Sequence, residues 1–172
     1  MVILETERLL FRAHETEDLE AYCAMETDPE VRRYVGGAPR PRDVAEKRFH
    51  DEMAANACNR LGLWAMVYKP EGSYIGRSGV YPDIDQDGKE IAGHGKLSFF
   101  IAPGYWGRGL ATEAGRAFVR YGFVELQLKR IGATVQVGNA ASVRVLEKLG
   151  FTLLRTETGE HRSFYHFELL PS

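Results

Sequence analysis

The chain has 172 residues, of which 44% are hydrophobic and 27% charged, and its formal net charge is -2. This length suits one domain that buries about 70% of its unfolded surface, so residues 1–172 are expected to form a single domain. No basic field of the kind that binds nucleic acid is present, and no apolar run is long enough to span a bilayer. The amino-terminal residues lack the pattern of a signal peptide. We therefore expect a cytoplasmic protein that binds neither nucleic acid nor membrane.

The first third of the chain predicts one short strand and several helices. Residues 9–12 read LLFR and indicate a strand. Thr16 and the acids after it are typical of a helix start, and the proline of Asp28-Pro29 is favoured in a first helical turn. The sequence GGAPRP at 36–41 interrupts the helical pattern, and a long helix is expected over residues 43–59.

The two cysteines, Cys23 and Cys58, both fall in segments that read as helices. Two cysteines do not form a disulfide framework, and a zinc site would need further ligands at fixed spacing. Two reduced thiols and no bound metal are therefore expected.

The middle of the chain predicts strands joined by a hairpin. The three strands are expected at residues 63–68, 74–81 and 96–102. Between the last two, three aspartates at alternate positions precede Gly88 and imitate the start of a calcium loop. The twelfth position from Asp83 is His94, where such a loop requires a glutamate. An Asp-Gly pair also favours a hairpin turn, so we predict a solvated hairpin tip.

The carboxy-terminal half predicts two helices among three strands. Residues 110–126 carry apolar side chains on one helical face, and residues 130–137 read as a strand. Asn139 is a good N-cap and Gly150 a good helix stop. Two strands are expected to follow, at residues 151–156 and 163–170. The whole order indicates a mixed α/β sandwich around a central sheet.

The most informative segment is residues 99–114, where an apolar strand enters a glycine-bearing loop that opens into a helix. Backbone N–H groups and a helix N-terminus meet there and favour a phosphate or pyrophosphate. A Walker A loop would need Lys and Ser or Thr where Leu110 and Ala111 stand. A dinucleotide fingerprint would need a third glycine where Thr112 stands. A plain structural turn before a buried helix is the other interpretation.

Three segments resemble the GNAT superfamily of acetyl-CoA-dependent acyltransferases. Residues 106–111, WGRGLA, are similar to its Gln/Arg-x-x-Gly-x-Gly/Ala loop, with Trp106 in place of Gln or Arg. This variant resembles the branch that contains ribosomal-protein N-terminal acetyltransferases. Residues 139–151, NAASVRVLEKLGF, resemble the second block, Asn-x-x-Ser and a helix ending in Leu-Gly-Phe. Residues 5–12, ETERLLFR, are similar to the opening strand of that branch.

The resemblance spans nearly the whole chain and implies an α/β fold of GNAT type. Such a fold has a central, twisted, mostly antiparallel sheet of about seven strands, flanked by about four helices, with strands 4 and 5 splayed apart. It further implies one N-acetyltransferase domain over residues 1–172, with acetyl-CoA as co-substrate and no metal. The expected acceptor is a primary amine, on a peptide N-terminus or a small molecule, and a homodimer is left open.

The cofactor residues follow from the loop and the resemblance. The backbone N–H groups expected to face the pyrophosphate of coenzyme A belong to Gly107, Arg108, Gly109, Leu110, Ala111 and Thr112. The resemblance implies that the backbone of Phe99 and Ile101 pairs with the amide-rich acyl arm, which adds to the sheet like a strand. It also implies that Asn139 contacts this arm. Glu113, in the first turn of the loop helix, is explained by the helix dipole alone.

Acetyl transfer to an amine needs a proton donor for the thiolate and an acceptor for the amine proton. The resemblance implies that Ser142 is the donor, although a first-turn serine is also ordinary. Relatives often carry a glutamate base where this chain has Lys96. His94 lies two residues earlier, and histidine titrates near neutral pH, so it is a candidate base. The alternatives are a water chain without a dedicated base, or water-mediated action of Glu90, Asp83 or Asp85.

The acceptor site is implied to lie between the first helices and the last hairpin. Residues expected near it are Arg33, Tyr34, Trp64, Tyr81, His161 and Tyr165. The competing function is a non-catalytic CoA-binding sensor or interaction domain, which the missing carboxylate at Lys96 favours.

Overall fold

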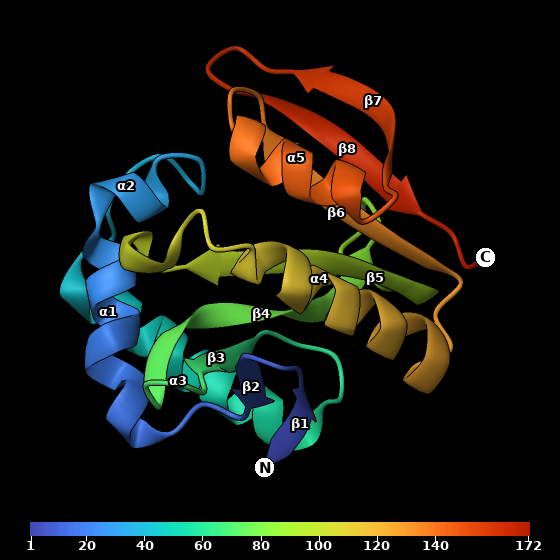
Figure 1. Cartoon of the computed structure of the whole chain (residues 1–172). Coiled ribbons are helices and arrows are strands. Elements are labelled where there is room, and N and C mark those ends of the chain that lie inside the picture. The colour runs from blue at the N-terminus through green and yellow to red at the C-terminus, as the bar shows by residue number, and fades with distance from the viewer.

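A single open sheet of eight strands forms the scaffold in the computed structural model, which describes residues 1–172 (Figure 1). The strand order is β1-β2-β3-β4-β5-β6-β8-β7. The strands are β1 Val2–Glu5, β2 Leu9–Arg12, β3 Trp64–Tyr68, β4 Ser73–Ile84, β5 Glu90–Ile101, β6 Arg130–Gln136, β7 Thr152–Thr158 and β8 Ser163–Leu169. The α-helices are α1 Leu19–Thr27, α2 Pro29–Arg32, α3 Arg42–Cys58, α4 Leu110–Arg120 and α5 Ala140–Lys148.

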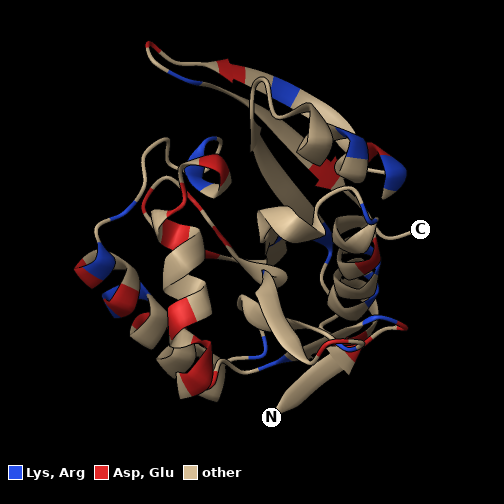
Figure 2. Cartoon of the chain, turned by 60° about the vertical axis from the view of Figure 1, so that its left-hand side comes forward, with Lys and Arg blue, Asp and Glu red and all other residues tan.

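Helices cover both faces of the sheet. Helix α4 packs on β4 and β5, and the main core lies between them, with Phe11, Trp64 and Phe118 fully buried. Helices α1 and α3 pack against each other on the other side and enclose a separate small cluster. Charged residues lie mostly on helices and loops, and the central strands are largely uncharged (Figure 2). The predicted mixed α/β architecture is confirmed.

Strands β5 and β6 form the one parallel pair of the sheet, and they separate along their length. Their pairing covers three positions only, from His94 opposite Arg130 to Lys96 opposite Gly132. Strand β5 continues beside β4 as far as Ile101, and β6 continues beside β8 as far as Gln136. The expected splay is confirmed. The predicted strands 4 and 5 are β5 and β6 in the structure, because β1 was not predicted and shifts the numbering by one.

Local differences from the predicted elements are small. Strand β5 begins at Glu90, six residues earlier than expected, and the predicted hairpin tip is confirmed by Asp85, whose N–H donates to the Lys89 carbonyl at 2.8 Å. Helix α4 ends at Arg120 and continues as a π-turn over Tyr121–Glu125. The two cysteines lie in α1 and α3 as predicted, one buried and one exposed, and both are free. None of the helices combines the length and hydropathy needed to cross a membrane.

Candidate functional site

A cleft of about 270 Å³ opens where β5 and β6 separate. Its walls include Phe99 on β5, Val135 on β6, and the predicted pair Asn139 and Ser142 at the start of α5. Tyr34, in the segment after α2, closes another side. The structure therefore brings three predicted site residues, Phe99, Asn139 and Ser142, together in one cavity. Phe99 and Ser142 lie 43 positions apart in the sequence.

The main chain of β5 faces this cleft at Phe99. The Ser98 carbonyl points to β4, where it accepts a hydrogen bond from the Ser78 hydroxyl at 2.8 Å. Successive residues of a strand direct their N–H and C=O groups to opposite sides, so those of Phe99 point toward β6, which has moved away. At Ile101 the carbonyl already accepts a bond from the Trp106 indole N–H at 2.6 Å. Phe99 is thus the residue with open backbone groups, and Ile101 does not line the cleft.

The loop before α4 is built for backbone exposure. Gly107 and Gly109 have φ values of +74° and +78°, a conformation that glycine adopts without strain. Gly109 is the N-cap of α4, and the first N–H bonded within the helix is that of Glu113, which donates to the Gly109 carbonyl at 3.1 Å. The N–H groups of the preceding turn, those of Leu110, Ala111 and Thr112, have no helical acceptor. Free N–H groups at the N-terminus of a helix favour the binding of an anion.

A clamp of charged groups holds this loop, and sequence reasoning missed it. Glu113 accepts hydrogen bonds from the Thr6 hydroxyl at 2.6 Å, from the Arg8 backbone N–H at 3.0 Å and from Arg8 Nε at 2.7 Å. Burial would raise the pKa of Glu113, but these hydrogen bonds and the charge of Arg8 hold that pKa below its ordinary value. The carboxylate therefore ties the segment before β2 to the first turn of α4.

Arg8 also fixes the orientation of one peptide group in the loop. Its Nη1 donates to the Arg108 carbonyl at 3.0 Å. In a trans peptide the C=O and the following N–H point in opposite directions, so the Gly109 N–H is directed away from Arg8. The sequence alone shows the similarity of residues 5–12 to the family, but only the folded chain shows that this segment supports the loop.

The start of α5 presents a free hydroxyl to the cleft. The side-chain oxygen of Asn139 accepts a bond from the Ser142 N–H at 3.2 Å, so the predicted cap is confirmed. The helix stop is also confirmed, because the Phe151 N–H donates to the Leu146 carbonyl at 3.0 Å and Gly150 has a φ of +87°. The Ser142 hydroxyl itself makes no hydrogen bond within the protein.

The structure does not bring the candidate base His94 to the cleft. His94 lies in the paired part of β5, opposite Arg130, and four residues of strand before Ser98 correspond to about 13 Å. Lys96 also points elsewhere, because its ammonium lies 3.5 Å from a carboxylate oxygen of Asp83. No carboxylate lines the cleft. The assignment of His94 depended on strand position alone, and the register with β6 puts it on the wrong side of the splay.

A second pocket, of about 390 Å³, lies between α3 and the face of β4 and β5. Arg48 and Glu52 line it from α3, and it shares Tyr81, Ser98 and Phe100 with the cleft. Of the residues expected near an acceptor, Tyr34 and Tyr81 line the cleft. Trp64 is fully buried in the main core, and the cleft and pocket linings do not include Arg33, His161 or Tyr165.

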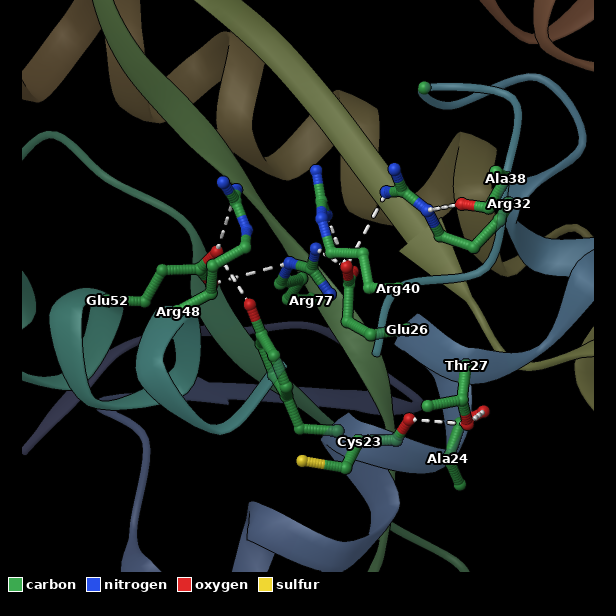
Figure 3. A network of polar contacts seen from close by, with 12 residues as sticks. Cys23, Ala24, Glu26, Thr27, Arg32, Ala38, Arg40, Arg48, Glu52 and Arg77 are labelled. Atoms are coloured by element: carbon green, nitrogen blue, oxygen red, sulfur yellow. Dashed lines mark hydrogen bonds and ion pairs between the residues drawn. The ribbon is translucent and has the colours of Figure 1, made fainter. Parts of the chain in front are cut away.

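A buried ionic network (Figure 3) includes Arg48 and Glu52 of the second pocket and extends from them into the protein. Glu26, with 1% of its side chain exposed, pairs with Arg77, Arg40 and Arg32. Burial would raise the pKa of Glu26, but these guanidinium groups hold it below its ordinary value. Arg77 lies between the rings of Tyr22 and Phe100, 4.6 and 4.4 Å from their centres. The network joins α1 and the segment after α2 to β4.

Comparison with known proteins agrees with this geometry. The family model of the acetyltransferase (GNAT) domain matches residues 8–152. An uncharacterized N-acetyltransferase, p20, of Bacillus licheniformis is 33% identical over 156 residues, which cover 88% of this chain and 83% of the relative. A crystal structure of a GNAT-family acetyltransferase from Bacillus anthracis has a TM-score of 0.84 at 25% identity, covering 99% of this chain and 98% of that one.

A further structural neighbour is the spermidine N-acetyltransferase of Vibrio cholerae in complex with CoA and spermine. Its TM-score is 0.77 at 21% identity, and the match covers 96% of each chain. At this identity the likeness concerns the fold. The domain match and the N-acetyltransferase relatives together show that the chain belongs to the GNAT family and is an acetyl-CoA-dependent acetyltransferase.

Proposed function

We propose that the protein moves the acetyl group of acetyl-CoA to a primary amine, by direct attack within a ternary complex. The observation that carries the proposal is the cleft itself. It combines the open backbone groups of Phe99 with the free hydroxyl of Ser142, and the anion-binding turn of α4 packs against the same strand. These are the groups that hold a thioester arm, polarise its carbonyl and protonate its leaving group.

In this proposal the α4 turn anchors the pyrophosphate of coenzyme A. The donors are the N–H groups of residues 107–112, from Gly107, Arg108, Gly109, Leu110, Ala111 and Thr112. The acyl arm then extends along β5 as an added strand, with the Phe99 N–H directed at the thioester carbonyl. Asn139 borders the arm. Ile101 does not contact the arm, and its carbonyl instead fixes the turn by accepting the hydrogen bond of the Trp106 indole N–H.

The reaction follows from this placement. The neutral amine attacks the thioester carbon, the oxygen of the tetrahedral intermediate accepts a hydrogen bond from the β5 backbone, and the carbon–sulfur bond breaks. Ser142 donates a proton to the departing thiolate, and water returns to Ser142 the proton that the amine gives up. The amine loses its extra proton to water, since the cleft holds no carboxylate and His94 lies outside it. The acceptor is a peptide N-terminus or a small molecule, and the spermidine acetyltransferases among the neighbours act on one such amine.

The proposal is tested by thermal denaturation and by thiol release. Acetyl-CoA at about 100 times its dissociation constant should stabilise the fold by about 2.7 kcal/mol, a shift of several degrees in Tm, whereas NAD should have no effect. Thiol release from acetyl-CoA should then depend on an added primary amine. Stabilisation by CoA without amine-dependent release would instead favour the non-catalytic sensor.

Arg8→Gln is expected to weaken acetyl-CoA binding about tenfold, because the charged hydrogen bonds that orient the loop are each worth about 1.5–3 kcal/mol and are partly exposed here. The KM for acetyl-CoA should rise while kcat stays close to the wild-type value. Lys69→Gln is the matched control, because Lys69 binds the Thr6 carbonyl of the same segment at 2.9 Å without reaching the loop. Equal effects of the two variants would contradict a specific role of Arg8 in the loop.

A further inference from the structure

We infer that the second pocket receives the acceptor and selects an amine that carries a carboxylate, such as a short peptide with a free carboxyl end. This inference rests on the proposed acetyl transfer and names its acceptor class. It is carried by three features of the described chain: the contact between the pocket and the cleft, the net charge of the ionic network that extends from the pocket, and the guanidinium of Arg48, which makes no hydrogen bond within the protein.

The pocket adjoins the place where the thioester would lie. One face of α3 lines it at the helical spacing of residues 48, 52, 55 and 56, and β4 and β5 form the opposite wall. Tyr81, Ser98 and Phe100 belong to both the pocket and the cleft. Phe99, whose backbone faces the cleft, lies between two of them on β5. A molecule in the pocket therefore reaches the reacting carbon past Ser98 and Phe100.

The pocket lining holds one arginine, Arg48, and one glutamate, Glu52, and the ionic network that extends from it carries an excess of positive charge. The connected network contains the guanidinium groups of Arg32, Arg40, Arg48 and Arg77 and the carboxylates of Glu26 and Glu52. Glu26 is shared by three of the arginines, and Glu52 by Arg48 and Arg77. The buried Nη1 of Arg77 has no hydrogen-bond partner. The arginines outnumber the carboxylates, so this side of the site favours an anion and repels a polycation.

Arg48 is the group positioned to meet that anion. Its Nη2 lies 3.7 Å from the Glu52 carboxylate and makes no hydrogen bond within the protein. Glu52 is held away from this anion by its own contacts: its Oε1 accepts a bond from the Tyr22 hydroxyl at 2.9 Å, and its buried Oε2, which accepts no hydrogen bond, lies 3.3 Å from Arg77 Nε in an ion pair. A guanidinium binds a carboxylate through two parallel hydrogen bonds. The pocket volume of about 390 Å³ leaves room for a short peptide.

The experiment compares two acceptors that differ in the charge at one end, and a polycation. Thiol release is measured with a dipeptide that has a free carboxyl end, with the amide of the same dipeptide, and with spermidine. The change lies away from the attacking amino group, and the two dipeptides are compared at equal concentrations of neutral amine. The wild type should prefer the free dipeptide about tenfold in kcat/KM, which corresponds to about 1.4 kcal/mol.

Variants on α3 separate charge recognition from folding. Arg48→Gln should raise the KM for the free dipeptide about tenfold and leave the KM for the amide and for acetyl-CoA unchanged, whereas Arg48→Lys should restore part of the preference. Arg42→Gln is the matched control, because Arg42 lies on the same helix outside the pocket and pairs with Glu20 and Glu46. It should behave as wild type.

Three results would overturn the inference. Turnover of the amide or of spermidine as fast as the free dipeptide would remove the anion preference and leave the proposed acetyl transfer intact. Absence of thiol release with every amine, although acetyl-CoA raises Tm, would remove both. An equal rise in KM for the free and amidated dipeptides in Arg48→Gln would reduce Arg48 to a packing residue.

Discussion

Ser142→Ala is expected to lower kcat about 100-fold and to leave the affinity for acetyl-CoA unchanged, because positioned general acids contribute about 100-fold or more. The hydroxyl has no partner within the protein and lines the cleft, whereas the Ser142 N–H, which remains in the variant, keeps the cap with Asn139. Helix α5 should therefore stay intact. Steady-state thiol release gives kcat, and thermal shift with acetyl-CoA gives the binding.

The control for Ser142→Ala is Ser73→Ala, at the start of β4 and outside both cavities. This variant should retain full activity. If Ser142→Ala also keeps full activity, Ser142 is a first-turn residue of α5 with no part in proton transfer. A large rise in the acetyl-CoA KM would instead assign it to binding.

Glu26→Gln should have the largest effect on stability, a loss of about 3–5 kcal/mol, because removing one partner leaves buried charges uncompensated. Three arginines converge on this carboxylate, and Arg77 is itself fully buried. Glutamine keeps the shape of the side chain and removes its charge. The free energy of unfolding should be measured by urea denaturation, with Tm as a second readout.

Glu20→Gln provides a control on the same helix. Glu20 is exposed and pairs with Arg42 at the surface, where ion pairs contribute little, so the variant should unfold like the wild type. If Glu26→Gln unfolded at the same urea concentration, the arginines would have other partners. Adding Arg77→Met to Glu26→Gln should recover part of the lost stability, because both buried charges are then removed.

The parts of the site that sequence predicted are those set by local backbone chemistry. The loop between β5 and α4 needs a residue with positive φ at position 109, which favours glycine, and the side chain of Asn139 caps α5 by accepting the N–H of Ser142, three positions later. Both signals lie within a few residues of the structure that they determine. The hairpin at Asp85 belongs to the same class.

The parts that sequence missed depend on residues that meet only in the folded chain. Arg8 and Glu113 lie 105 positions apart, and Glu26 and Arg77 lie 51 apart. No periodicity or spacing relates such pairs. His94 illustrates the same limit for a strand, because its side of the splay depends on which residues of β5 pair with β6. Strand β1 was missed because it has only four residues and pairs with a single neighbour, β2, which the folded chain brings beside it.

The separation of β5 and β6 places two edges of a sheet inside the molecule. Outer edges accept almost any extended chain, and proteins usually have to protect them. Here the start of α5 and the segment around Tyr34 border the gap. Only an extended chain that is thin enough to pass between them can therefore enter. At Phe99 the chain that enters contacts main-chain groups. Substitution of the Phe99 side chain does not remove these groups, and only proline would abolish the N–H. The side chain at position 99 is therefore free to diverge in evolution while the main-chain groups of the slot are kept.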